Sequence, residues 1–268
     1  MRVVITGSSH GIGRALAERL IRRGDDVWGL ARSPHAIDVE GAGTFNSRLC
    51  DVSDWAQVES AALETAAAWP SADAVITCAG IHGEVGRTLK VDPLEWRQTI
   101  QVNLVGTFNV IRAFSDLISR TERRTKIVCF AGGGATKARP NFSAYGAAKT
   151  GIVRLVETIA AEERTRPFDI NAVAPGAINT RLTEEVIALG PERVGEAEYN
   201  AALKQKAAGG ASLDRALDLV EWLLSPASDG ISGKLLSAPW DPWPTMGSQV
   251  AQLAESDTYT LRRVLPQE

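Results

Sequence analysis

The sequence of 268 residues contains only three cysteines, no long apolar run and no marked excess of either charge. Cys50, Cys78 and Cys129 are too far apart for a Cys-x-x-Cys motif or a zinc pattern, and an odd number fits a disulfide framework poorly. Each cysteine lies in or beside an apolar run, so we expect small buried hydrophobes rather than reactive thiols. The sequence therefore predicts no metal site.

Several classes of protein are excluded by what is missing. No run of about 18 apolar residues is present, which argues against a membrane-spanning helix. The apolar stretch after Met1 is too short for a signal peptide, so we expect a cytoplasmic location. The net charge of −3 gives no electrostatic reason to expect nucleic acid as a partner. A composition of 44% hydrophobic and 23% charged residues is typical of a globular protein and argues against disorder.

Short β-branched runs alternate with longer helical patterns along the chain. The runs predict strands at 3–5, 27–31, 74–77, 126–130, 168–173 and 233–236, and helices after residue 11 and at about 54–69, 93–119 and 143–164. Uncharged strands that lack polar alternation favour a parallel sheet covered by helices on both faces. We expect an α/β, doubly wound, Rossmann-like fold in a single domain over 1–268, with a substrate-covering insertion at about 179–210 and a C-terminal extension at about 239–268.

A glycine-rich turn follows the first predicted strand and opens the first helix. It contains Gly7, Ser9, His10, Gly11, Ile12 and Gly13. A helix N-terminus in this position offers unpaired backbone N–H groups and a positive dipole end to a pyrophosphate, and glycines allow a close approach. Three glycines alone indicate only a turn, but the strand–turn–helix context favours dinucleotide binding.

The end of the second predicted strand indicates which cofactor binds. An acidic residue there binds a ribose 2′-hydroxyl, whereas arginine accommodates a 2′-phosphate. This sequence has Arg32 and Ser33, and no carboxylate until Asp38. The pattern favours NADP(H), with NAD(H) as the alternative; a solvated surface arginine is the competing interpretation of Arg32.

Tyr145 and Lys149 stand four residues apart at the start of a predicted helix, so both lie on one face. A free tyrosine titrates near 10, which makes it a poor acid or base at neutral pH. A lysine ammonium about 4 Å away would lower the phenol pKa by about 3 units at an effective dielectric of about 20. The pair therefore suits general acid–base catalysis, although the spacing alone is weak evidence.

Several motifs occur together in one order, and they carry a family resemblance. These are Thr6-Gly7-x-x-x-Gly11-Ile12-Gly13, Asp51-Val52, Ala79-Gly80, Asn103, Tyr145-x-x-x-Lys149 and Pro175-Gly176-x-x-x-Thr180. Over about residues 1–238 the chain resembles the short-chain dehydrogenase/reductase family.

The resemblance implies roles for these residues. Tyr145 would exchange a proton with the substrate oxygen. Lys149 would lower the tyrosine pKa and hold the nicotinamide ribose, and Asn103 would anchor a water for proton relay. From the residues alone, Asn103 also fits a helix-kinking polar residue that is satisfied internally. The remaining matches would contact the cofactor: Asp51 and Val52 at the adenine, Ala79 and Gly80 close by, Pro175 and Gly176 in a motif, and Ile178 and Thr180 at the carboxamide.

Two departures from the family pattern stand out. The family places a serine 13 residues before the catalytic tyrosine, and this position is Gly132 here. Backbone N–H groups of the glycine run are the favoured replacement, with Thr136 or the substrate itself as alternatives. Beyond the last strand, Trp240 and Trp243 are expected to pack within the chain or, alternatively, against a neighbouring subunit or the substrate segment. His82 is expected to be a solvated loop residue without a catalytic role.

These expectations combine into one main prediction. The chain would be an oxidoreductase that transfers a hydride between NADP(H) and a secondary alcohol or carbonyl compound, with Tyr145 as the general acid/base. The alternatives are a non-catalytic NADP(H)-binding regulatory protein and an epimerase or dehydratase that recycles its nicotinamide. By the same resemblance, a dimer or tetramer is expected, with a small molecule as the only other partner.

Overall fold

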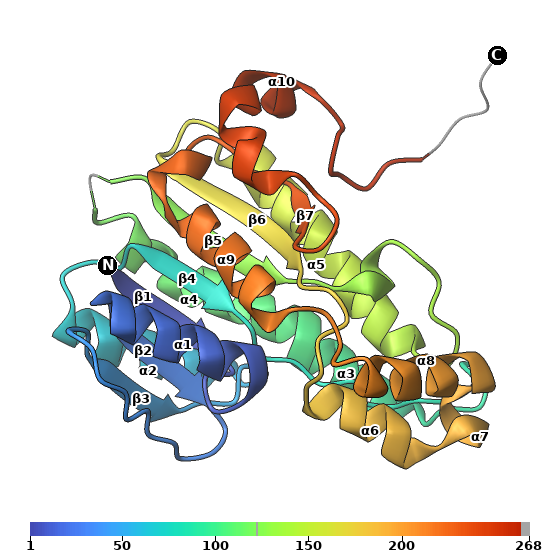
Figure 1. The fold of residues 1–268 in the computed structure, drawn as a ribbon. Coiled ribbons are helices and arrows are strands. Elements are labelled where there is room, and N and C mark those ends of the chain that lie inside the picture. Colours follow the sequence, from blue (N-terminus) through green and yellow to red (C-terminus); the bar gives the residue numbers. More distant parts are fainter. Residues whose placement is uncertain (122, 264–268) are drawn as a thin grey trace.

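A single parallel sheet forms the centre of the computed structural model, which describes residues 1–121 and 123–263. Its strands are β1 (Arg2–Thr6), β2 (Asp26–Ala31), β3 (Phe45–Leu49), β4 (Ala74–Thr77), β5 (Thr125–Phe130), β6 (Phe168–Ala174) and β7 (Leu235–Ser237). They lie in the order β3-β2-β1-β4-β5-β6-β7, and every neighbouring pair is parallel (Figure 1). The predicted doubly wound, Rossmann-like α/β fold is confirmed.

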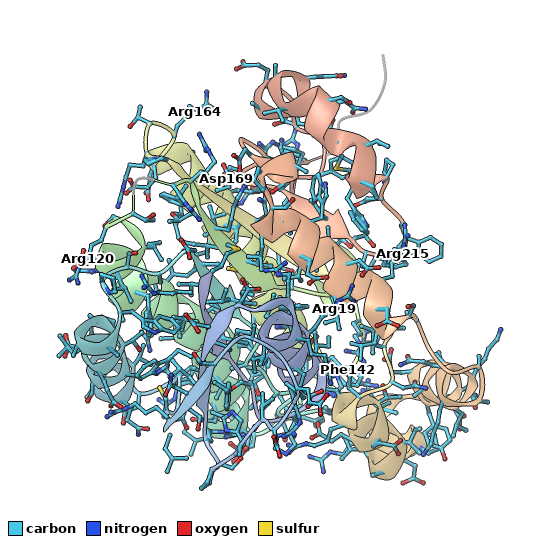
Figure 2. All side chains as sticks on the ribbon, turned by 60° about the vertical axis from the view of Figure 1, so that its left-hand side comes forward. Arg19, Arg120, Phe142, Arg164, Asp169 and Arg215 are labelled. Carbon is cyan, nitrogen blue, oxygen red and sulfur yellow. The ribbon has the colours of Figure 1, made fainter. Side chains whose placement is uncertain are left out.

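Helices cover both faces of this sheet (Figure 1). On one face α1 (Gly11–Arg23) and α9 (Leu213–Leu224) bury leucines against β1, β4 and β5. Arg19 of α1, labelled in Figure 2, forms an ion pair of 2.8 Å with Glu221 of α9. On the other face, α2 (Trp55–Ala68), α4 (Gly106–Ile118) and α5 (Ser143–Glu162) enclose the second apolar core. The two cores hold the carboxyl ends of the strands in fixed positions.

The helix that precedes β5 is continuous but not uniform. It begins as α3 (Pro93–Ile100), where the Asp92 carboxylate accepts hydrogen bonds from the N–H groups of Leu94 and Glu95. One turn of π-helix (Gln101–Val105) then joins it to α4. The prediction of one long helix is confirmed, and the π-helical turn, a feature frequent at functional sites, lies at Asn103.

Three short helices lie between β6 and α9. They are α6 (Arg181–Leu189), α7 (Pro191–Val194) and α8 (Glu196–Ala207), and they lie beyond the carboxyl edge of the sheet (Figure 1). A third apolar cluster joins them to the start of α5 and consists of Val85, Phe142, Tyr145, Val186, Val194 and Ala202. Tyr145 is thereby covered by the helices of the predicted insertion.

The C-terminal region departs in part from expectation. Trp243 is buried and donates from Nε1 to the Ala238 carbonyl at 3.2 Å, whereas Trp240 is 84% exposed. The chain continues through a 3₁₀-helix (Trp243–Gln249) and α10 (Val250–Glu255). The last five residues of the predicted extension, 264–268, lie outside the described residues. Within residues 1–121 and 123–263, no helix has the length and apolar character needed to cross a membrane.

Candidate functional site

A cavity of about 400 Å³ opens at the carboxyl ends of β1 and β4. β2 and β3 lie on one side of β1, and β4 and the later strands lie on the other side, so the strand order reverses here. Doubly wound sheets bind ligands at this switch point. Of the predicted cofactor-binding residues, those lining the cavity are Gly7, Ser9, His10, Gly11, Ile12, Arg32, Ser33, Asp51, Val52, Ala79, Gly80 and Thr180. One site therefore brings together residues from five separate segments of the chain.

The glycine turn has a conformation that side chains would obstruct. Gly7 has a φ of +70°, and a Cβ there would lie 2.9 Å from the backbone of Ala79. A Cβ on Gly13 would lie 2.4 Å from the carbonyl oxygen of Gly7. The Thr6 hydroxyl also accepts hydrogen bonds of 3.1 Å from the N–H groups of Cys78 and Ala79. The close approach of the β1 and β4 ends shapes the floor of the cavity.

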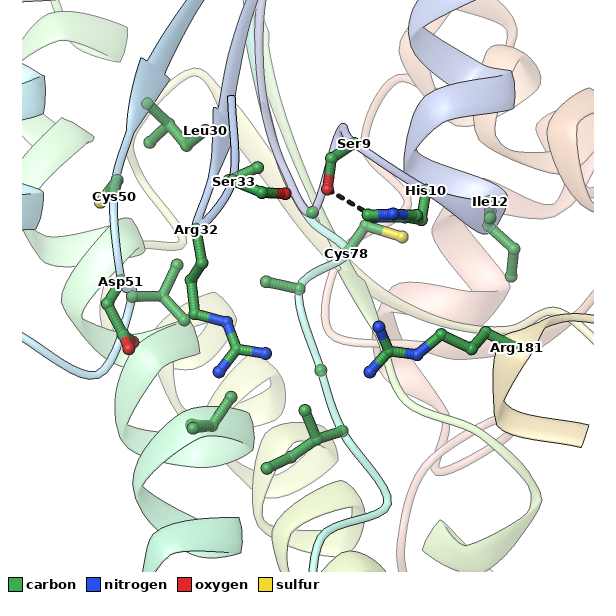
Figure 3. Close-up of a pocket in the computed structure, with 18 of the residues that line it drawn as sticks. Ser9, His10, Ile12, Leu30, Arg32, Ser33, Cys50, Asp51, Cys78 and Arg181 are labelled. Carbon is green, nitrogen blue, oxygen red and sulfur yellow. Dashed lines mark hydrogen bonds between the residues drawn. The ribbon is translucent and has the colours of Figure 1, made fainter. Parts of the chain in front are cut away.

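The N-terminus of α1 fits a phosphate group. His10 occupies the N-cap without a side-chain hydrogen bond to the helix, and the first turn holds no acidic residue. The His10 ring instead bonds the Ser9 hydroxyl at 2.7 Å (Figure 3). Because the first N–H groups of a helix have no intrahelical partners and carry the positive end of the dipole, this terminus can bind an anion.

Two guanidinium groups project into the cavity from opposite sides, Arg32 after β2 and Arg181 at the start of α6 (Figure 3). The nearby Asp51 carboxylate is engaged locally, because its Oδ1 accepts from the Ser53 N–H at 2.9 Å and from the Ser53 hydroxyl at 2.6 Å. The cavity thus presents positive charge at the place predicted for a ribose 2′-phosphate.

The lining also includes residues that the motifs did not indicate. They are Leu30, Ala31, Cys50, Cys78, Ile81, Val102, Arg181 and Leu182. The predicted residues Gly13, Pro175, Gly176, Ile178, Tyr145 and Lys149 are not part of the lining. Of these, Ile178 is buried in the apolar core beside α9, and Gly176 has a φ of +92° in the loop after β6.

Tyr145 and Lys149 occupy successive turns at the start of α5, and both are buried. The Lys149 Nζ lies 5.5 Å from the centre of the Tyr145 ring and donates a 2.8 Å hydrogen bond to the carbonyl oxygen of Phe130. Burial lowers the pKa of Lys149 to about 8, with Cys78 and Cys129 acting in the opposite direction. The lysine is therefore a cation that can lose its proton near neutral pH.

The pKa of Tyr145 differs from the sequence-based expectation. Burial raises the pKa of this phenol, and only Arg139 opposes the shift. The predicted lowering by Lys149 is absent in this arrangement because the ammonium is directed at the Phe130 carbonyl rather than at the phenol oxygen.

Gly132 lies directly beside the tyrosine hydroxyl. It has a φ of +139°, and a Cβ there would stand 3.5 Å from the Tyr145 Oη. Gly134 faces the same ring, since its Cβ position would be 3.6 Å from Tyr145 Cδ1. Position 132 is thus close enough for a side-chain hydroxyl to reach a group bound at the tyrosine oxygen.

Asn103 connects the π-helical turn to the loop after β4. Its Nδ2 donates to the carbonyl oxygens of Ile81 and Thr99, both at 2.9 Å, and its Oδ1 accepts from the Ile81 N–H at 3.1 Å. A Cβ on Gly80 would lie 2.7 Å from Asn103 Oδ1 and 3.6 Å from Lys149 Nζ. The interpretation of Asn103 as an internally satisfied residue agrees with these bonds, and the same bonds bring it next to Lys149.

His82 is not the solvated loop residue that we expected. It is 5% exposed, and its ring packs edge-on against Tyr145 and Phe142, with centroids 5.1 Å and 5.4 Å apart. Burial, together with Arg139 and Lys149, lowers the pKa of His82 to about 3. A lone loop histidine gives no signal of this kind, because the burial comes from α6 and α8, far away in the sequence.

Comparisons with known proteins found a matching family model, similar sequences and similar structures. A family model described as short chain dehydrogenase matches residues 1–188. The chain is 29% identical to the short chain dehydrogenase pigC of Monascus ruber over 251 residues, covering 89% of this chain and 78% of that protein. It is 30% identical to the 3-oxoacyl-(acyl-carrier-protein) reductase FabG of Escherichia coli over 183 residues, which cover 67% of this chain and 74% of that protein. The crystal structure of levodione reductase superposes with a TM-score of 0.77 at 26% identity, covering 93% of this chain and 97% of that one.

Proposed function

The chain belongs to the short-chain dehydrogenase family, and we propose that it transfers a hydride between NADP(H) and a secondary alcohol or carbonyl compound, with Tyr145 as the general acid/base. The observation that carries this proposal is the alignment of Tyr145, Lys149 and Asn103 around the loop at Gly80. Tyr145 supplies a phenol that can exchange a proton, Lys149 supplies a buried cation beside it, and Asn103 holds the adjacent loop in place.

The cavity fits a dinucleotide. The α1 N-terminus would hold the pyrophosphate, and Arg32 with Ser33 would contact a 2′-phosphate. Asp51 and Val52 would lie at the adenine, while Ala79, Gly80 and Thr180 would line the path toward Tyr145. The chain after β2 carries Arg32 and Ser33 in the cavity lining and no carboxylate, which supports NADP(H) over NAD(H).

The chemistry divides between cofactor and protein. When bound, the nicotinamide supplies a hydride to the carbonyl carbon in reduction and accepts one from the alcohol carbon in oxidation. Tyr145 donates its proton to the carbonyl oxygen in reduction and removes the hydroxyl proton in oxidation. Lys149, with its pKa lowered to about 8, stabilises the phenolate that remains once its ammonium turns from Phe130 toward the phenol.

Gly132 takes the place of the family's serine in this proposal. The cleft then has no side-chain hydroxyl at the position 3.5 Å from Tyr145 Oη, and hydrogen bonding to the reacting oxygen falls to Tyr145 and to other donors. Removing one such donor in other enzymes costs on the order of 10²–10³ in rate. A replacement donor is therefore expected in the surroundings of Tyr145.

The test is NADPH oxidation by a panel of carbonyl compounds, followed by absorbance, with Tyr145→Phe as the matched variant. We expect this variant to lower kcat by roughly 10²–10⁴, the contribution of a positioned acid, and to keep NADPH affinity within a few-fold. Unchanged turnover in Tyr145→Phe would refute the mechanism. Product formation without net NADPH oxidation would instead favour a recycled nicotinamide, and tight NADPH binding with no turnover would favour a regulatory protein.

A further inference from the structure

The buried imidazole of His82 has a ring nitrogen without a hydrogen-bond partner. Among the described residues, its Nδ1 is inaccessible to solvent and has no hydrogen bond. Unpaired buried polar groups are uncommon in folded proteins and are costly, so each one calls for an explanation. The mechanism above does not use this atom, although its ring packs against the proposed catalytic tyrosine.

The surroundings of His82 determine which ring nitrogen carries the proton. Arg139 Nη1 lies 3.4 Å from His82 Nε2, and a guanidinium has donors only. The low pKa of about 3 keeps the ring neutral at physiological pH, so it carries one proton. Because Nε2 faces a donor and must accept, that proton lies on Nδ1, and Nδ1 is a donor.

Arg139 is itself held in place and is not available to bind an anion. Its Nε donates to Glu198 Oε1 of α8 at 2.9 Å, and its guanidinium stacks over the Phe142 ring at 3.9 Å from the centroid. The charge of Arg139 is therefore matched by a carboxylate, and its Nη1 remains directed at His82 Nε2 as a donor.

An acceptor faces the unpaired donor across a short gap. Glu185 Oε2 of α6 lies 3.8 Å from His82 Nδ1, too far for a direct hydrogen bond. The other oxygen, Oε1, accepts from the Nε of Arg181 at 2.9 Å. One carboxylate oxygen is thus fixed by Arg181, and the second is directed toward the imidazole N–H.

We propose that His82 and Glu185 bind a hydroxyl group of the substrate beside its reacting carbonyl, so that the substrate class is a hydroxy ketone, or the corresponding diol in the oxidation direction. A hydroxyl accepts from Nδ1–H and donates to the carboxylate, which matches a donor and an acceptor that face each other. A substrate carboxylate would be repelled by Glu185 and Glu198, and a purely apolar group would leave Nδ1 unpaired. This assignment rests on the proposed oxidoreductase function.

The required movement is small. Two hydrogen bonds of about 2.8 Å to an inserted hydroxyl would separate Nδ1 and Oε2 by roughly 4.5 Å. The observed separation is 3.8 Å, so Glu185 needs to shift outward by less than about 1 Å. Because Glu185 is on α6 and is one-third exposed, this shift does not disturb the sheet.

The first test reads the tautomer directly and does not depend on turnover. Long-range ¹⁵N–¹H correlation spectra of the full chain near pH 7 should show His82 neutral with its proton on Nδ1, with the signal assigned by its loss in His82→Asn. A proton on Nε2, or a charged ring, would overturn the proposal.

The second test compares matched substrates with NADPH: cyclohexanone against 2-hydroxycyclohexanone, and 2-butanone against 3-hydroxy-2-butanone. We expect the wild type to prefer the hydroxy ketone by roughly 10- to 100-fold in kcat/KM, the range of a hydrogen bond to a charged or buried partner. In His82→Phe, the ratio of kcat/KM for the hydroxy ketone to kcat/KM for the ketone should fall to about one. His82→Asn, whose amide nitrogen lies near the position of Nδ1, should retain most of it.

The outcomes separate this inference from the proposed function. A wild type that reduces ketones without preferring the hydroxyl, or that reduces no hydroxy ketone in the panel, overturns the His82–Glu185 assignment. Equal preference in His82→Phe and wild type overturns it as well. Loss of all turnover in Tyr145→Phe together with an absent preference leaves the oxidoreductase mechanism intact and removes only the substrate assignment.

Discussion

The Nζ of Lys149 lies 5.5 Å from the centre of the Tyr145 ring and is hydrogen-bonded to a strand carbonyl instead of to the phenol. Two groups proposed for proton transfer are thus buried side by side, with no carboxylate among the charges that influence either pKa. Such an arrangement is unfavourable for the fold, because burying an ammonium without a counter-ion costs free energy.

Replacing Lys149 by methionine should therefore stabilise the protein at neutral pH. The folded-state pKa of about 8 lies below the reference value of 10.5, so the penalty is fully present below about pH 8 and disappears as the pH approaches 10.5. At about pH 7 the free energy of unfolding of Lys149→Met should exceed that of wild type by at most about 3 kcal/mol, with the gap closing toward high pH. Urea unfolding across this pH range measures it.

Lys126→Met is the matched control. Lys126 is also buried, but its Nζ contacts Asp169 at 2.9 Å and Asp229 at 2.7 Å. Removing it leaves Asp169 with a lost partner, so this variant should be destabilised, which is the opposite sign. If Lys149→Met were no more stable than wild type at about pH 7, the buried, unpaired ammonium would not exist in solution.

Serine at position 132 should act differently from alanine at the same position. Both variants carry a Cβ at a φ of +139°, so both should lose about 1–2 kcal/mol of stability from backbone strain. Only serine adds a hydroxyl close to Tyr145 Oη. We expect kcat of Gly132→Ser to exceed that of Gly132→Ala by about tenfold or more, the scale of one added donor. Equal kcat values in steady-state assays would show that the position has no access to the reacting oxygen.

The sequence predicted features of the fold that depend on local spacing. Strand 74–77 agrees with β4, and the predicted helix start at Asp54 agrees with a carboxylate that caps α2 through the N–H groups of Ala56 and Gln57. Such features are visible because the residues that make them are neighbours along the chain. The edge strand β3 was missed, since three of its five residues are exposed and it lacks an apolar run.

Features produced by distant segments could not be predicted in the same way. His82 is buried because α6 and α8 pack over the loop after β4, and no local pattern reports that contact. The direction of the Tyr145 pKa shift also depends on where Lys149 Nζ points, which spacing along a helix does not determine. Arg181 was missed for the same reason, because α6 brings it to a cavity whose other walls come from distant parts of the chain.

The preference for NADPH over NADH should depend on Arg32 and not on Arg181. Arg32→Ala should lower kcat/KM for NADPH by roughly 10- to 100-fold, the scale of a charge-assisted hydrogen bond, and leave the value for NADH within a few-fold. Arg181→Ala removes the same charge from the opposite wall of the cavity and should not change the NADPH/NADH ratio. Kinetics with both cofactors measure this ratio. A ratio unaffected by Arg32→Ala would contradict the 2′-phosphate assignment.

Asn103 should matter more for the fold than another buried asparagine on the same helix. Asn103→Ala removes three hydrogen bonds and leaves the N–H and carbonyl groups of Ile81 without partners, so it should lower the free energy of unfolding by about 2–4 kcal/mol. Asn109→Ala removes one hydrogen bond of 3.0 Å to the Val52 carbonyl and should cost about 1–2 kcal/mol. Chemical denaturation compares the two variants.

Asn103 holds the loop that leads to His82, so replacing Asn103 should also weaken substrate binding. Without the bonds at Ile81, the adjacent imidazole is free to move away from Tyr145, and KM for the carbonyl substrate should rise more in Asn103→Ala than in Asn109→Ala. If both variants were equally destabilised and KM stayed equal in both, the Asn103 side chain would serve only to tie the π-helical turn to the loop after β4. A selective rise in KM for Asn103→Ala would instead identify it as a positioning residue for the loop beside the proposed catalytic tyrosine.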